Sequence, residues 1–128
     1  MEFAIGALEY GLVAAPKHFA FNDQESERGG VSPWMTEQRA REVELRAYQI
    51  AFEASKYDTD DFDAGMRGLM TSFSKIGAIE CTCSYGLMTE ILANEWGFIG
   101  YAVTDIYDDV DLWTAVLNSG TTCFDTRG

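Results

Sequence analysis

The stretch "GFIGYAVTDIYDDVDLW" (residues 97–113) joins an apolar, β-branched segment to four aspartates, Asp105, Asp108, Asp109 and Asp111. Its first part has the composition of a buried strand that ends at Asp105. The three later aspartates suit the first turn of a helix, where the helix dipole stabilises negative charge. A strand that runs through a carboxylate directly into a helix is typical of a β-α step.

The same alternation continues on both sides of this stretch. Strands are expected at residues 10–19, 66–73, 99–105 and 119–125. Helices are expected from Ser32 or Thr36 to Tyr57, at residues 85–96 with Gly97 following the last turn, and at residues 108–118. The order β-α-β-α-β-α-β predicts an α/β fold with parallel strands joined by right-handed helical crossovers.

The first long helix shows an apolar repeat that predicts its buried face. The repeat comprises Val43, Ala47, Ile50, Ala51 and Ala54. Residues 20–33 and 74–84 have the composition of loops. An acidic turn carries Asp58, Asp60, Asp61 and Asp63, but Phe62 stands where a calcium loop needs a ligand. We therefore expect a solvated turn.

Composition excludes several classes of function. The chain has 128 residues, the size of one domain, and 21 acidic against 9 basic residues give a net charge of −12. Nucleic acid and membrane surfaces are therefore not expected as partners, and no apolar run reaches the roughly 20 residues of a bilayer span. Neither a signal peptide nor a disulfide framework is evident, so a reducing, cytoplasmic location is expected. Cys81, Cys83 and Cys123 are expected as buried thiols rather than metal ligands.

Polar side chains follow the expected strands. The strand ends carry Lys17 and His18, then Ser72 and Phe73, then Thr104 and Asp105. Because the carboxyl ends of parallel strands meet at one edge of a sheet or one end of a barrel, these groups should converge. A lysine, a histidine and a carboxylate on one face predict a functional site.

Several ordered segments resemble glycoside hydrolase family 3, which includes β-glucosidases and β-xylosidases built on a barrel and an α/β sandwich. The segments are "KHFAFNDQESER" (17–28), "REVELRAYQIAFE" (41–53), "GLMTSFSKIG" (68–77) and "CSYGLMTEILANEWGFIGYAVTD" (83–105). The resemblance covers nearly the whole chain. It implies that residues 1–128 form the C-terminal half of the family's barrel domain, a partial (β/α)8 TIM-type barrel of about four parallel β-α steps without the sandwich domain.

The resemblance also implies roles for individual residues. Asp105 matches the nucleophile of a retaining mechanism, which forms a glycosyl-enzyme intermediate. Lys17, His18 and Arg28 match residues that hydrogen-bond the sugar, while Met70 belongs to a segment that walls the pocket. The implied substrate is a β-linked gluco- or xylo-configured saccharide or glycoside. No metal or other cofactor is implied.

Three positions depart from the family pattern. Phe73 stands where many members carry a tyrosine whose hydroxyl lies near the nucleophile, so the ring is kept and that hydrogen bond is lost. Ser74 replaces a frequent asparagine, and Ile106 replaces a frequent tryptophan that stacks on sugar. Sugar specificity is therefore expected to differ. The N-acetylhexosaminidase branch is disfavoured because the loop after residues 17–19 contains no histidine.

The resemblance lacks the early barrel strands and the general acid/base, which glucosidase-like members carry in the sandwich domain. Hydrolysis by this chain alone should therefore be very weak or undetectable. Exposed strand edges favour self-association, or complementation by the missing strands. Two alternatives stay open: a non-catalytic sugar-binding or subunit-like half-barrel, and a barrel lyase in which Lys17 forms a Schiff base.

Overall fold

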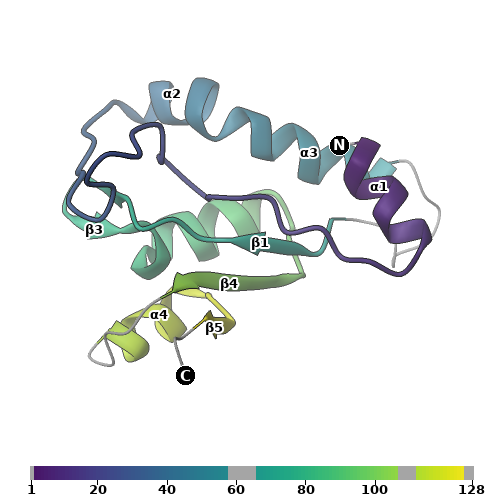
Figure 1. The fold of residues 1–128 in the computed structure, drawn as a ribbon. Coiled ribbons are helices and arrows are strands. Elements are labelled where there is room, and N and C mark those ends of the chain that lie inside the picture. The colour runs from purple at the N-terminus through teal and green to yellow at the C-terminus, as the bar shows by residue number, and fades with distance from the viewer. Residues whose placement is uncertain (1, 58–65, 107–111, 126–128) are drawn as a thin grey trace.

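The computed structural model describes residues 2–57, 66–106 and 112–125 (Figure 1). Its helices are α1 (Glu2–Glu9), α2 (Glu37–Arg39), η1 (Ala40–Glu44), α3 (Arg46–Tyr57), η3 (Cys81–Cys83), η4 (Gly86–Glu95) and α4 (Trp113–Ser119). Its strands are β1 (Gly68–Met70), β2 (Lys75–Ile76), β3 (Ile79–Glu80), β4 (Tyr101–Ile106) and β5 (Cys123–Asp125). The acidic turn at residues 58–65 and the three aspartates 108, 109 and 111 lie outside the described residues.

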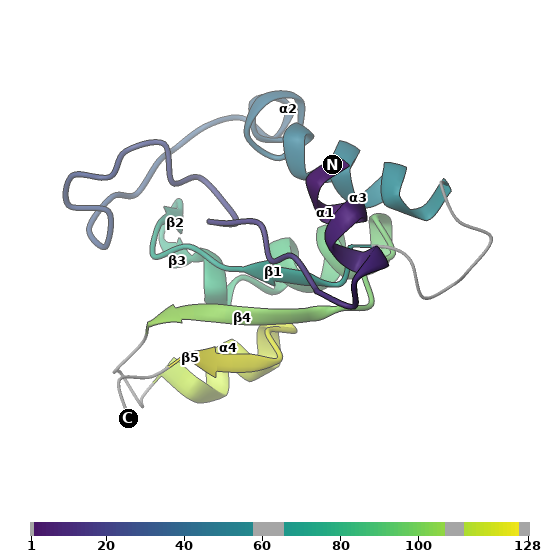
Figure 2. The same ribbon diagram turned by 45° about the vertical axis from the view of Figure 1, so that its right-hand side comes forward.

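A parallel sheet organises the chain. Its strand order is β1-β4-β5, with Leu69 opposite Ala102 and Val103 opposite Cys123. The helix η4 connects β1 to β4, and the segment containing α4 connects β4 to β5. Figures 1 and 2 show η4 behind β1, while α4 lies beside β5. The predicted α/β fold with parallel strands is therefore confirmed for the last three predicted strands.

The first predicted strand, residues 10–19, is wrong for most of its length. Only Phe19 forms a strand-like bridge, to Thr71 on the edge of β1. Around it, Met70 donates its backbone N–H to Pro16, and Phe19 donates to Met70. Pro16 has no N–H to contribute to a ladder, which limits regular pairing before it. The segment nevertheless lies alongside β1, so the spatial order is residues 16–19, β1, β4 and β5.

The core lies between the sheet and its helices. Leu69 and Ala102 point to this side and are buried, while Met70 and Val103, the next pair in register, point to the opposite side and are only partly covered. This alternation is the period of two that a strand imposes. Phe19 contacts Tyr48 at 5.0 Å and Trp96 at 6.1 Å between ring centroids. One face of the sheet is thus packed and the other is more open.

The buried face predicted for the first long helix is wrong. Val43 is 49% exposed and Ile50 48% exposed, whereas Leu45 is 1% and Phe52 2% exposed. Ala47 is also exposed and Ala51 half-buried, while the side chain of Ala54 lies outside the described part. The cause is η1, a π-helical turn in which Leu45 donates its N–H to Ala40, five residues earlier. Such a wide turn shifts every later residue around the helix axis.

Two helix ends follow the prediction, and one loop does not. Thr36 caps the long helix, because its hydroxyl oxygen accepts the N–H of Arg39 at 3.2 Å. Gly97 follows η4 with φ 65°, the left-handed geometry that favours glycine. Residues 74–84, however, contain the hairpin β2–β3, in which Ile76 pairs with Ile79, and the short helix η3. Strands of two residues are too short to show an alternating pattern.

Candidate functional site

Asp105 lies near the carboxyl end of β4 and is only 8% exposed. One carboxylate oxygen, Oδ1, accepts the backbone N–H of Ile106 at 2.8 Å. The other, Oδ2, is buried and accepts no hydrogen bond from the described residues. Buried carboxylates require compensating charge or hydrogen bonds, so the groups around Oδ2 decide the character of the site.

His18 is the nearest of these groups. Its Nε2 lies 3.2 Å from Oδ2 of Asp105. The ring is anchored through the backbone, because Tyr48 donates its hydroxyl to the His18 carbonyl at 2.8 Å. Burial lowers the pKa of His18, and the charges of Lys17 and Arg28 lower it further, while Asp105 raises it. The balance favours a neutral imidazole at pH 7, which carries one N–H donor.

Arg28 supplies the positive charge of the site. Its Nη1 lies 3.6 Å from Oδ2 of Asp105 and 3.3 Å from Oε1 of Glu25. Its Cζ lies 4.7 Å from the centroid of the Phe73 ring, over the face of that ring. The guanidinium therefore contacts β4 at Asp105 and the segment that follows β1 at Phe73.

Met70 and Lys17 do not contact the Asp105 carboxylate in the way that His18 and Arg28 do. Met70 pairs in register with Val103, two residues before Asp105, so Met70 lies on the sheet face that Asp105 shares. Lys17 is exposed and forms no ion pair with Asp105, although the structure describes both side chains. The structure thus brings together His18, Arg28, Phe73 and Asp105, and leaves Lys17 beside His18 rather than at the carboxylate.

Small polar side chains hold the loop that carries these groups. Ser72 donates its hydroxyl to the carbonyl of Ala20 at 2.5 Å, and Cys81 donates its thiol to the same carbonyl at 3.4 Å. Ser74 donates to Asn22 Oδ1 at 3.2 Å. Ser72 was predicted only as a strand-end residue and Tyr48 was not predicted at all, because hydroxyls at buried positions look like ordinary core polar groups.

The three cysteines differ in exposure. Cys81 is buried, Cys83 is half-buried and Cys123 is exposed, so the expectation of buried thiols is wrong for Cys123. Burial raises the pKa of Cys81 and raises that of Cys83 to about 11. Within the described ranges, no three side chains of His, Cys, Asp or Glu gather in an arrangement that could hold a metal ion.

A polar hollow adjoins the site on the helix side. It measures about 280 Å³, and its lining includes Lys17, His18, Asp23, Glu44 and Tyr48. A hydrogen bond with Asp23, together with burial, raises the pKa of Glu44. Arg39 also contacts Glu44 at 3.1 Å. These contacts tie the loop after His18 to the long helix.

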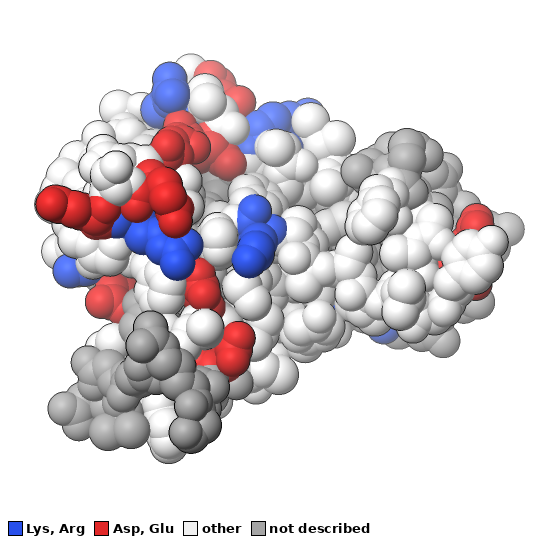
Figure 3. Space-filling model, in the orientation of Figure 1, with Lys and Arg blue, Asp and Glu red and all other residues white. Residues whose placement is uncertain are grey.

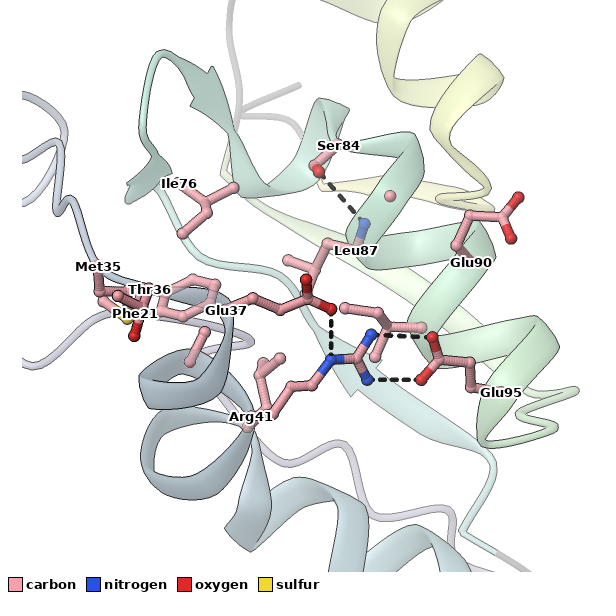
Figure 4. A pocket seen from close by; sticks show the side chains of 14 residues that line it. Phe21, Met35, Thr36, Glu37, Arg41, Ile76, Ser84, Leu87, Glu90 and Glu95 are labelled. Carbon is pink, nitrogen blue, oxygen red and sulfur yellow. Dashed lines mark hydrogen bonds and ion pairs between the residues drawn. The ribbon is translucent and has the colours of Figure 1, made fainter.

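A larger, mostly apolar groove lies elsewhere, between the long helix and η4 (Figure 4). It measures about 410 Å³ and contains neither His18 nor Asp105 in its lining. Arg41 crosses its rim, with hydrogen bonds to Glu37 at 2.8 Å and to both carboxylate oxygens of Glu95 at 2.6 and 2.9 Å. The groove therefore belongs to helix packing rather than to the Asp105 site.

The surface agrees with a site at the strand ends. Charged side chains of both signs gather at the end of the molecule toward which the arrow of β4 points, as Figures 2 and 3 show together.

None of the helices in the described residues is both long and apolar enough to cross a membrane. Ile106, next to Asp105, is 39% exposed.

Comparison with known proteins finds relatives named as beta-glucosidases. Probable beta-glucosidase J of Emericella nidulans is 33% identical over 118 residues, which are 92% of this chain and 13% of that protein. The beta-glucosidase of Ruminococcus albus is 30% identical over 106 residues, 83% of this chain and 10% of its own. The chain therefore spans about an eighth or less of the length of these relatives.

A solved structure shows the same arrangement of elements. Beta-glucosidase 3B from Thermotoga neapolitana, in complex with glucose, superposes with a TM-score of 0.82 at 28% identity, over 95% of this chain and 16% of that one. Residues 1–114 match the model of the glycosyl hydrolase family 3 N terminal domain, which has a TIM-barrel-like α/β fold. The chain therefore belongs to glycosyl hydrolase family 3.

Proposed function

We propose that this chain is the C-terminal half of the barrel domain of a retaining β-glycosidase of the β-glucosidase type, with Asp105 as the nucleophile. One observation carries the assignment: Oδ2 of Asp105 is buried between His18 Nε2 at 3.2 Å and Arg28 Nη1 at 3.6 Å, while Oδ1 is held by a backbone N–H. One oxygen is thus fixed, and the other accepts no hydrogen bond from the described part of the chain that would weaken it as a nucleophile.

The chemistry follows from this geometry. Oδ2 attacks the anomeric carbon, a C–O bond to the enzyme forms, and the bond to the leaving oxygen breaks. That oxygen needs a proton from a general acid, which the resemblance places outside this chain. Water then cleaves the intermediate and regenerates the carboxylate. Arg28 stabilises the negative charge of Asp105 before attack.

The sugar-binding roles rest on donor geometry. Neutral His18 offers one N–H, and Arg28 offers a planar set of donors suited to neighbouring hydroxyls. Lys17 is one of the residues that line the polar hollow beside His18, and Met70 and Phe73 would supply apolar walls of the sugar site. We propose a β-linked gluco-configured sugar as substrate, in line with the glucose held by the T. neapolitana enzyme, and xylo-configured sugars as close alternatives.

Four neighbouring chain segments support the half-barrel. Residues 16–19, β1, β4 and β5 lie side by side in chain order, with helices on one face and the more open face carrying Met70, Val103 and Asp105. In a closed barrel that open face would be the interior. The remaining strands, and the acid/base, would come from further sequence, another chain or a second copy.

An activated 2-deoxy-2-fluoro-glucoside tests the assignment. Both this chain and the polypeptide encoded by the complete surrounding gene are incubated with it, digested and analysed by mass spectrometry. The longer protein should carry one glycosyl group on the peptide containing Asp105, and Asp105→Asn should carry none. A label on another carboxylate would remove the nucleophile assignment, and a gene that encodes only these 128 residues would remove the fragment assignment.

A non-catalytic sugar-binding role is the second candidate, because the donors His18 and Arg28 are in place within this chain. Titration calorimetry of the chain with a gluco-configured imino sugar addresses it directly. Measurable binding with no Asp105 labelling would favour this role over catalysis. The lyase alternative gains no support from the exposed Lys17, and borohydride should trap no adduct there.

A further inference from the structure

Among the residues that the structure describes, three groups contact the guanidinium of Arg28, and only one of these three can set its plane. Glu25 contacts Nη1 at 3.3 Å but is strongly exposed and lies on the same loop, so it moves with Arg28. Asp105 contacts Nη1 at 3.6 Å and so fixes the position of one guanidinium nitrogen. The ring of Phe73 lies 4.7 Å from Cζ and faces the guanidinium as a whole.

The backbone around Phe73 is anchored on both sides. Ser72 donates its N–H to Phe19 at 2.8 Å, and Cys81 donates its N–H to Ser74 at 3.0 Å. Both serines also bond the loop with their hydroxyls, at Ala20 and at Asn22. Phe73 therefore stands on a fixed segment next to β1, whereas Arg28 belongs to a stretch with turns but no helix or strand.

We propose that Phe73 is a positioning residue whose ring face orients the Arg28 guanidinium toward Asp105. The catalytic purpose of this positioning rests on the proposed function, whereas the titration that tests it does not require the chain to be active. A planar guanidinium stacks on an aromatic face with its N–H groups directed outward in the plane. Stacking on Phe73 would therefore determine which N–H groups of Arg28 point toward Oδ2 of Asp105. The ring, and not a hydroxyl at its tip, supplies this effect, which is why phenylalanine suffices here.

The chain contains its own reporter of this geometry. His18 is the only histidine among the 128 residues, so a single imidazole Hε1 resonance follows its titration by NMR. The charged groups that act on it are Asp105, Lys17, Arg28 and Glu25. Arg28 lowers the pKa of His18 and Asp105 raises it, so a guanidinium that leaves the carboxylate should raise that pKa.

The test compares matched variants of the full 128-residue chain. Arg28→Gln should raise the pKa of His18, and Phe73→Leu should raise it by a large share of the same shift. Phe73→Tyr keeps the ring and should leave the pKa near that of the parent chain. Glu25→Gln should instead lower it slightly, because Glu25 acts on His18 with the opposite sign.

The double variant Phe73→Leu/Arg28→Gln separates positioning from a general loosening of the fold. Its titration should match that of Arg28→Gln alone, because in this proposal Phe73 acts on His18 through Arg28. A shift in the double variant beyond Arg28→Gln, or an unchanged pKa in Phe73→Leu, would overturn it. Should Phe73→Leu fail to fold, Arg28→Lys serves in its place, since it keeps the charge and loses the planar stack. It should raise the pKa, and an unchanged pKa would count against stacking.

The labelling experiment and this titration fail independently. Labelled Asp105 together with an unresponsive Phe73→Leu would keep the catalytic assignment and overturn the positioning role. Unlabelled Asp105 together with the expected titrations would keep the positioning role and overturn the catalytic assignment.

Discussion

Nε2 of His18 lies 3.2 Å from Oδ2 of Asp105, although one residue comes from the first loop and the other from the last strand but one. Neither local sequence explains the contact. It forms because residues 16–19 lie against β1 and β1 lies against β4, which brings two strand ends to one place. The charge of Asp105 therefore acts on the His18 ring, and the pKa of His18 reports on that charge.

Neutralising Asp105 should lower the pKa of His18. The carboxylate favours the protonated imidazole, so Asp105→Asn removes an effect that raises the pKa and leaves burial, Lys17 and Arg28, which lower it. NMR titration of the single histidine measures the change. Asp125→Asn, at the end of the neighbouring strand β5, is the control and should leave the titration as it was. Equal shifts in both variants would show that His18 does not sense Asp105 specifically.

The stability of the chain should fall as the pH drops through about 6.5. Folding lowers the pKa of His18 below the ordinary value of 6.5, so the unfolded chain binds the proton more readily than the folded chain. The free energy of unfolding therefore rises with pH across this window and levels off above it. Urea unfolding at several pH values provides the measurement. His18→Gln should flatten the slope in this window, and a slope that persists would assign it to other groups.

Leu45→Ala should destabilise the chain by about 2–5 kcal/mol, because Leu45 is 1% exposed and its removal leaves a cavity under the long helix. Val43→Ala, two residues earlier and 49% exposed, should change the free energy of unfolding by no more than about 0.5 kcal/mol. Denaturant unfolding compares the pair. The reverse ranking would restore the face predicted from the sequence and contradict the π-helical turn.

Gly100→Ala should disturb the pairing of β1 with β4. A Cβ at this position would lie 2.0 Å from the backbone oxygen of Arg67, which accepts the N–H of Tyr101 at 2.7 Å. We expect a loss of about 1–3 kcal/mol, as overpacking usually costs. Gly86→Ala meets no atom within 4 Å and should stabilise by about 0.4–1 kcal/mol. Thermal unfolding of both variants gives the comparison, and a harmless Gly100→Ala would argue against this close approach.

Arg41→Gln should weaken the link between the long helix and η4 in a pH-dependent way. Arg41 lowers the pKa of Glu95, so this contribution is present above about pH 4.5 and disappears as Glu95 becomes protonated in acid. The groups are largely solvated, so the loss at neutral pH should be no more than about 1 kcal/mol. The control is Arg46→Gln, because the Arg46 guanidinium donates to the neutral amide of Gln49 at 2.9 Å and this variant should show no such pH dependence. A loss that stays constant down to acid pH would assign it to packing.

Much of the fold could be predicted because its signals are local. The β-branched run before Asp105, the glycine after η4 and the threonine cap of the long helix each depend on a few neighbouring residues, and all three are confirmed. The buried face of the helix could not be predicted from the spacing of its apolar residues. The π-helical turn at residues 40–44 rotates the later residues away from the positions that a regular α-helix would give them. The hairpin β2–β3 was not predicted, because its strands have two residues each and are too short to show an alternating pattern.

The candidate site was predicted in part for a different reason. Converging strand ends and the family resemblance together named His18, Arg28, Phe73 and Asp105, which the structure places in contact. Lys17 was named as well, yet its side chain stands away from the carboxylate. Tyr48 was missed, because a hydroxyl that bonds a distant carbonyl becomes visible only once the helix is docked. Their roles in catalysis stay proposals for the labelling experiment.

The spatial order of the strand segments, which equals their order in the chain, bears on how the protein is synthesised. Every segment pairs with the one made just before it, from residues 16–19 to β1, then β4, then β5. A growing chain can therefore dock each segment on an existing edge as it leaves the ribosome, and the entropy of closing each loop is incurred in separate steps. Among the described segments, β1, β4 and β5 each find the partner on one side already synthesised.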